Sequence, residues 1–128
     1  MKNVVLLLFV FCFSISHAQT IELKKKHLKN YTGLIPPYEV NYNNRLEKVE
    51  ATAITVSLVK DSIYVNVGLS KWSGTYTAIK TSKKTIEISG KMNSSGIKEI
   101  IILYPRKRKL IRKGLFPQSD AELKLKKD

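Results

Sequence analysis

Residues 54–67 read Ile-Thr-Val-Ser-Leu-Val-Lys-Asp-Ser-Ile-Tyr-Val-Asn-Val. Apolar residues occupy every second position on both sides of Lys60-Asp61. Successive side chains of a strand point to opposite faces, so this period of two predicts two half-buried strands. Lys60-Asp61 suits a tight turn between them. The stretch therefore predicts an antiparallel β-hairpin near the middle of the chain.

Similar patterns lie on both sides of this hairpin. The next strand is expected at 71–79, with Trp72, Gly74, Tyr76 and Ala78 on one face. Gly74 stands between two aromatic residues on that face, which indicates a bend or the close approach of another backbone. Further strands are expected at 38–42, from 46 to 51, and at 85–91, 97–104 and 109–112, with turns at 43–44 and 93–96.

These segments predict an all-β protein, a single antiparallel barrel or sandwich of about seven to eight strands. We divide the chain into a leader at 1–18, a basic lead-in at 19–30 and one β domain with its tail at 31–128. Residues 121–127 fit two alternatives. Ser119 and Glu122 have capping-box spacing, which favours a short C-terminal helix, whereas Leu123 and Leu125 alternate as in a strand.

The leader has the pattern of a cleavable secretory signal peptide. Lys2 precedes an apolar run from Val4 to Phe13, and Ser16 and Ala18 fit a small-x-small cleavage site. The run is shorter than the roughly 20 residues that cross a bilayer. We therefore expect cleavage after Ala18, a periplasmic or secreted protein, and no membrane-spanning segment afterwards. Cys12, the single cysteine, would leave with the leader, so no disulfide is expected.

The chain is strongly basic, and its charge favours an anionic partner. It has 23 Lys and Arg against 10 Asp and Glu, a net charge of +13 that becomes +12 without Lys2. Such a surplus attracts polyanions. The densest cluster is a candidate anion-binding strip for an envelope glycan, lipopolysaccharide or lipid headgroup; its members are Arg106, Lys107, Arg108, Lys109, Arg112 and Lys113. The alternative is a set of solvated charges that protects an edge strand from pairing.

Residues for catalysis or metal binding are scarce. His27 is the one histidine after the leader, and its lysine-rich surroundings predict an exposed, inert side chain. No pair of carboxylates has metal-ligand spacing. Glu99 sits within the apolar strand at 97–104, so we expect its side chain to be partly buried. We expect it to form a salt bridge; the alternative is that its place in this strand reflects only the alternation of side chains between the two faces. We therefore expect no enzyme, no cofactor, no metal and no specific nucleic-acid partner.

Four short motifs give a resemblance to a known family; they are Tyr31-Thr32-Gly33, Trp72-Ser73-Gly74-Thr75-Tyr76, Thr85-Ile86-Glu87-Ile88-Ser89-Gly90 and Gly114-Leu115-Phe116-Pro117. From 31 to 114 the chain resembles small exported lipocalin-like proteins of Gram-negative bacteria. The resemblance implies an up-and-down antiparallel barrel. Some barrels of this kind hold a small apolar ligand in the mouth, and for such a ligand Trp72 and Tyr76 are the candidate cavity residues. The first expectation for function is an exported, non-enzymatic binding protein with an anionic partner, and the alternative is a carrier of such an apolar ligand.

Overall fold

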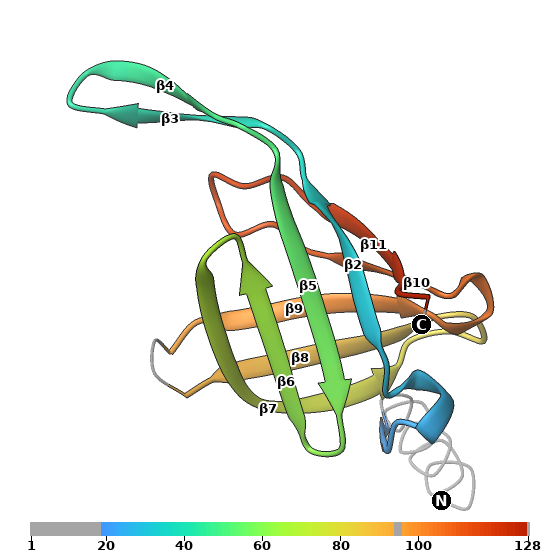
Figure 1. Cartoon of the computed structure of the whole chain (residues 1–128). Coiled ribbons are helices and arrows are strands. Elements are labelled where there is room, and N and C mark those ends of the chain that lie inside the picture. Colours follow the sequence, from blue (N-terminus) through green and yellow to red (C-terminus); the bar gives the residue numbers. More distant parts are fainter. Residues whose placement is uncertain (1–18, 94–95, 128) are drawn as a thin grey trace, which may run out of the picture.

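The computed structural model describes residues 19–93 and 96–127, so the expected leader and part of the turn at 93–96 lie outside the described residues. No helix within the described ranges is long and apolar enough to cross a membrane. The described chain is built from strands and two 3-10 turns (Figure 1). In chain order these are β1 (Thr20–Ile21), η1 (Lys25–His27), β2 (Asn30–Ile35), β3 (Tyr38–Tyr42), β4 (Arg45–Val49), β5 (Thr52–Val59), β6 (Ser62–Val67), β7 (Ser70–Lys80), β8 (Ile86–Met92), β9 (Lys98–Tyr104), η2 (Pro105–Lys107), β10 (Lys109–Arg112) and β11 (Ala121–Leu125).

Eight strands close into an antiparallel barrel. Their order is β7-β6-β5-β2-β11-β10-β9-β8, and pairing between β7 and β8 closes the circle. Barrel strands that follow one another in the chain thus pair with each other, and the first, β2, also pairs with the last, β11. β1 is an additional strand that pairs Ile21 with Ala78 of β7. β3 and β4 form a separate hairpin that projects from the barrel (Figure 1). The predicted fold class is confirmed, and the architecture is a barrel.

The central hairpin is present as the alternation predicted. β5 pairs with β6 in a register that sets Val56 opposite Val65 and Leu58 opposite Ile63, and all four are buried. Asp61 has a φ of 66°, the left-handed conformation that a tight hairpin turn requires and that aspartate tolerates. Period-two burial and turn chemistry therefore agree along this stretch.

The tail is a strand, and the alternative of a short C-terminal helix is wrong. β11 pairs with β10 on one side and with β2 on the other, as in the register of Leu123 with Leu110 and with Gly33. Ala121 and Leu123 are buried inside the barrel. A helix here would leave the edges of β2 and β10 unpaired, so the barrel itself selects the extended conformation.

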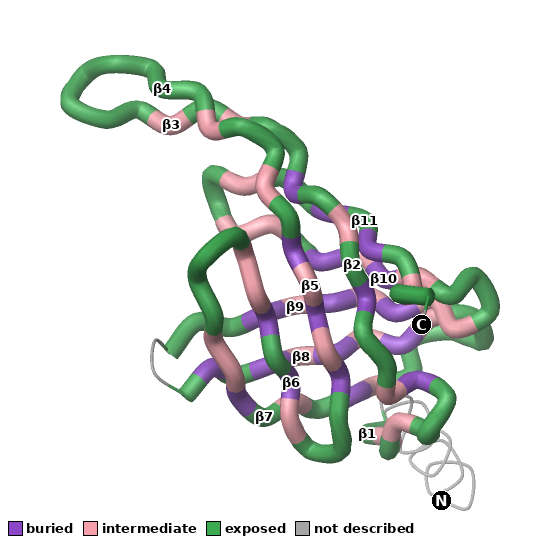
Figure 2. Tube along the Cα trace, viewed as in Figure 1, coloured by how far each residue is buried: buried purple, intermediate pink, exposed green. Residues whose placement is uncertain are grey.

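Apolar side chains fill the barrel interior. All eight strands contribute buried residues, seen as the purple positions in Figure 2. The apolar core consists of Tyr31, Ile35, Ile54, Val56, Leu58, Ile63, Val65, Ala78, Ile86, Ile88, Met92, Ile101, Leu103, Leu110, Ala121 and Leu123. At the buried Gly90, an added Cβ would lie 3.0 Å from Met92 Cε and 3.1 Å from Ile63 Cγ2. An eight-stranded barrel is just wide enough for such filling.

The connections between strands gather at two ends of the barrel, because consecutive strands run in opposite directions. One end, here named the basic end, comprises residues 22–29, 60–61, 81–85, 105–108 and 126–127, together with Lys80 at the end of β7. It lies at the lower right of Figure 1, where η1 and the chain's C-terminal end meet. The other, the hairpin end, comprises residues 36–51, 68–69 and 113–120 and the described parts of 93–97.

Candidate functional site

The predicted anion-binding strip is divided between three environments. Arg106, Lys107 and Arg108 are exposed and occupy the connection between β9 and β10, at the basic end. Arg108 has a φ of 50°, and its N–H donates to the carbonyl of Pro105 at 3.3 Å. This tight turn holds the three cations outside the sheet, where they are accessible to a partner.

Lys109 and Lys113 are engaged with side chains of their own chain. Lys109 Nζ lies 3.5 Å from a carboxylate oxygen of Glu122, and Lys113 Nζ lies 3.3 Å from one of Asp120. The ammonium of Lys109 also lies 5.6 Å from the centroid of the Tyr104 ring, within cation–π range. Lys113 is at the hairpin end, away from the turn at 105–108. These two residues therefore do not extend the exposed cluster along β10.

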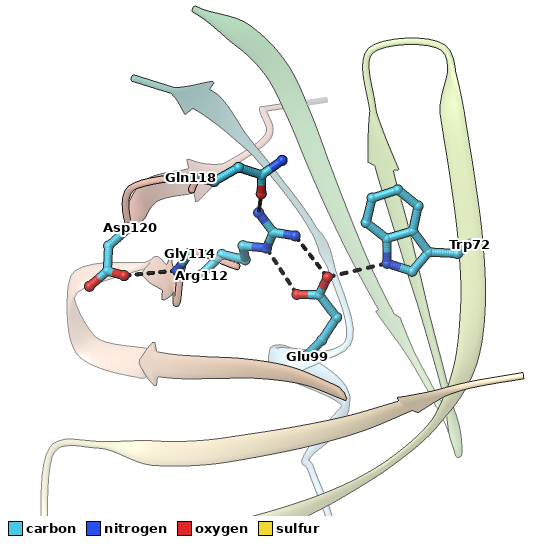
Figure 3. A network of polar contacts seen from close by, with 6 residues as sticks. All are labelled: Trp72, Glu99, Arg112, Gly114, Gln118 and Asp120. Carbon is cyan, nitrogen blue, oxygen red and sulfur yellow. Dashed lines mark hydrogen bonds and ion pairs between the residues drawn. The ribbon is translucent and has the colours of Figure 1, made fainter. Parts of the chain in front are cut away.

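Arg112 requires a correction, because it points into the barrel. Its side chain is fully buried, like that of Glu99 on β9. Arg112 Nε donates to Glu99 Oε2 at 2.9 Å, and Nη2 donates to Glu99 Oε1 at 2.8 Å (Figure 3). Leu110 and Arg112 have the same parity on β10, so the strand that buries Leu110 also buries Arg112. The salt bridge expected of Glu99 is confirmed.

Two more side chains complete this buried network. Arg112 Nη1 donates to Gln118 Oε1 at 2.6 Å, and Trp72 Nε1 donates to Glu99 Oε1 at 3.2 Å (Figure 3). The network thereby ties β7, β9 and β10 to the connection before β11. The guanidinium of Arg112 and the carboxylate of Glu99 bind each other and are also bound by Gln118 and Trp72. This arrangement is suited to stabilising the hairpin end. Buried charges require such complete pairing.

The connection from β10 to β11 is fastened a second time near its start. The backbone N–H of Gly114 donates to Asp120 Oδ1 at 2.8 Å (Figure 3). This hydrogen bond, together with Lys113, lowers the pKa of Asp120 below its usual value. The loop that carries Gln118 is thus held at both ends.

Trp72 and Tyr76, the candidate cavity residues, pack against the core but do not meet at one opening. Trp72 contacts Glu99 near the hairpin end. The hydroxyl of Tyr76 donates to the carbonyl of Val59 at 2.8 Å, beside the β5–β6 turn at the basic end. Each aromatic side chain has its polar atom committed to the protein's own structure.

Exposed cations gather at the basic end from five separate stretches of sequence. The set consists of Lys24, Lys25, Lys26, Lys29, Lys60, Lys80, Lys83, Lys84, Arg106, Lys107, Arg108, Lys126 and Lys127. Glu22 and Asp61 are the carboxylates among the described residues of this end, and none of the three ion pairs in the described chain includes a cation of the set. Most of these residues belong to connections that the sequence alone did not bring together.

His27 lies between two grooves of the basic end, and the expectation of an exposed side chain is wrong. One groove is lined by η1, η2 and Leu125, and the other by η1, η2 and the β7–β8 connection; Lys26, His27, Pro105 and Arg106 line both. His27 is 7% exposed, and neither Nδ1 nor Nε2 has a hydrogen-bond partner. Burial lowers the pKa of His27, and Lys26 and Lys24 lower it further.

This arrangement makes the protein sensitive to acid through His27. The folded-state pKa lies below the unfolded value of 6.5, so the unfolded chain binds more protons as the pH falls. The contribution of His27 to stability is present above pH 6.5 and is lost as the pH drops through its folded-state pKa. We expect wild type to lose more unfolding free energy than His27→Gln between about pH 7.5 and pH 5, measured by urea denaturation. Equal losses in both proteins would contradict this assignment.

Groups of three or more metal-binding side chains are absent from the described part of the chain. Comparisons of the chain with models of protein families, with curated proteins and with solved structures find no match.

Proposed function

We propose that this protein is an exported, non-enzymatic binding protein of the cell envelope or the secreted fraction, and that it contacts an anionic glycan, lipopolysaccharide or lipid headgroup through its basic end. The observation that carries the proposal is the gathering, at one end of the barrel, of exposed cations that take part in none of the ion pairs of the described residues. A surface of one sign raises the local concentration of oppositely charged partners and speeds their association. The leader's composition supports an exported protein.

The packed interior supports a surface site over a cavity. A carrier of a small apolar ligand needs unfilled space within the barrel, whereas the inward positions hold fully buried side chains such as Ile63, Ile88 and Leu103. The Glu99–Arg112 pair occupies further interior space near the hairpin end. Binding at the basic end requires no rearrangement of this core.

Binding to anionic vesicles tests the proposal. We expect the protein to bind vesicles of phosphatidylcholine and phosphatidylglycerol but not vesicles of phosphatidylcholine alone. Binding should weaken between 0.1 M and 1 M salt, because the Debye length falls from about 10 Å to about 3 Å. Cosedimentation measures the bound fraction. Binding that does not change with salt would contradict an electrostatic contact.

A matched pair of triple variants separates the basic end from net charge. Lys83→Gln, Lys84→Gln and Lys107→Gln remove three cations from the basic end. Arg45→Gln, Lys48→Gln and Lys71→Gln remove three exposed cations near the hairpin end. Each cation near an anionic surface contributes about 1 kcal/mol, so the first triple should weaken binding by about 100-fold. The second should bind almost as wild type does. Equal weakening would mean that net charge alone governs binding.

A further inference from the structure

The groove between η1 and η2 has the composition of a built oxyanion site. Its exposed rim carries five cations from two separate connections, namely Lys25, Lys26, Lys29, Arg106 and Arg108. Tyr31, Pro105 and Leu125 provide less polar lining. Nearby apolar groups reduce the screening of charge by water, so cations here attract an anion more strongly than isolated surface lysines do.

His27 is the second observation that points to a ligand. Its imidazole lines the groove and is nine-tenths buried, yet both ring nitrogens lack a partner. A buried polar atom without a hydrogen bond costs about 1–3 kcal/mol. An acceptor oxygen seated in the groove would relieve this cost at an imidazole N–H.

We propose that this groove binds a phosphomonoester group, held by Arg106 and Arg108 with the lysines of η1, and that His27 becomes a hydrogen-bond donor to it. The inference rests on the proposed function and names the anion. A phosphomonoester carries a charge of about −1.5 to −2 at neutral pH and three acceptor oxygens. It thus matches several converging cations better than a singly charged diester does, and arginine binds phosphate in a bidentate manner.

Occupancy of the groove is coupled to the protonation of His27. The charged groups that line the two grooves with this histidine are largely cationic. Its own segment supplies Lys24, Lys25, Lys26 and Lys29. Arg106 and Arg108 lie across one groove, and Lys80, Lys83 and Lys84 lie across the other. Glu22 is the acidic group, and Tyr31 is the further titratable group. Burial disfavours the imidazolium in the free protein, and the charges of Lys26 and Lys24 disfavour it further. A bound dianion reverses the local sign of charge and favours the imidazolium, which has two N–H donors.

Two vesicle compositions test the preference for a monoester. Phosphatidic acid presents a phosphomonoester, whereas phosphatidylglycerol presents a diester. Each lipid is mixed with phosphatidylcholine in the proportion that gives both vesicle preparations the same zeta potential. We expect about tenfold tighter binding to phosphatidic acid, the scale of one additional charge-assisted hydrogen bond. Arg108→Asn should abolish the preference, because it removes a guanidinium that holds the phosphate. Asparagine is the chosen replacement because it tolerates the left-handed backbone at this position. Arg45→Gln, an arginine of the projecting hairpin, should retain it.

The outcomes separate this inference from the proposed function. Equal binding to both vesicles would overturn the phosphomonoester site but leave an anion-binding basic end, whereas binding to neither would refute both. Inorganic phosphate distinguishes the source of the group. Competition by millimolar phosphate supports a site that recognises the isolated anion, and a preference that persists without competition supports a site for the membrane-borne headgroup.

His27→Gln tests the coupling. The ratio of its Kd to the wild-type Kd for phosphatidic acid vesicles cancels the titration of the lipid itself. We expect this ratio to rise several-fold as the pH falls from about 7.5 to about 6, because only wild type gains a proton-linked donor. Circular dichroism at each pH verifies that both proteins are folded. A ratio that is independent of pH would overturn the role of His27.

Discussion

Replacing Arg112 with methionine is expected to destabilise the barrel by about 3–5 kcal/mol, because the change leaves the Glu99 carboxylate buried without its partner. Both side chains are fully buried and joined by two hydrogen bonds. Methionine has a similar volume, so the loss reflects charge more than packing. For a domain of this size the Tm should fall by about 12 °C or more. Urea denaturation of the two proteins measures the difference.

The double variant Glu99→Leu, Arg112→Met is the control for this prediction. Removing both charges removes the desolvation cost of both, and apolar replacement of buried pairs is often neutral or stabilising. Trp72 and Gln118 lose their partners but are only partly buried, so water can replace the lost hydrogen bonds. We expect the double variant to recover most of the lost free energy. A double variant as unstable as Arg112→Met would show that the network supplies specific contacts that leucine and methionine cannot replace.

The strands could be predicted from the sequence because their signals are local. Alternation at 54–67, the proline after Tyr104 and the Asn43-Asn44 turn each depend on neighbouring residues. Both asparagines adopt positive φ, 51° and 61°, as a two-residue hairpin turn demands. The tail stayed ambiguous because its local signals favoured helix and strand alike. Its pairing with β2, more than 85 residues earlier in the chain, decided between them.

The candidate site could be predicted only in part, because its residues converge through topology. The turn at 106–108 was recognisable as a run of cations. Its proximity to Lys25, Lys29 and Lys83 follows from barrel closure, which brings alternate connections to the same end. The burial of Arg112 could have been predicted from its position two residues after Leu110, because alternate residues of a strand face the same side. The run of neighbouring cations instead favoured an exposed strip. His27 gave no signal of burial, since its sequence neighbours are lysines.

The closure between β7 and β8 depends on Gly74, where the sequence indicated a bend or a close backbone approach. An added Cβ would collide with the carbonyl oxygen of Lys91 and lie 2.7 Å from its carbonyl carbon and 2.8 Å from Met92 Cα. These atoms belong to the backbone of β8, so they cannot give way by rotating a side chain. The predicted close approach is confirmed. At this position β7 and β8 can pair because Gly74 has no side chain.

Gly74→Ala should therefore destabilise the protein by about 3 kcal/mol, at the upper end of the usual cost of overpacking. Alanine otherwise favours a strand interior over glycine by roughly 0.5–1 kcal/mol, so a loss of stability identifies the collision and not the backbone preference. Ser73→Ala, on the adjacent residue of the same strand, should change stability by less than about 0.5 kcal/mol. Hydrogen exchange should quicken in β7 and β8 of Gly74→Ala before it does in β2 and β5, because the strain enters at the closing pair. An alanine variant as stable as wild type, with unchanged exchange in β8, would mean that the strands separate at this point without cost and that closure depends on the remaining pairs from Thr75 to Lys80.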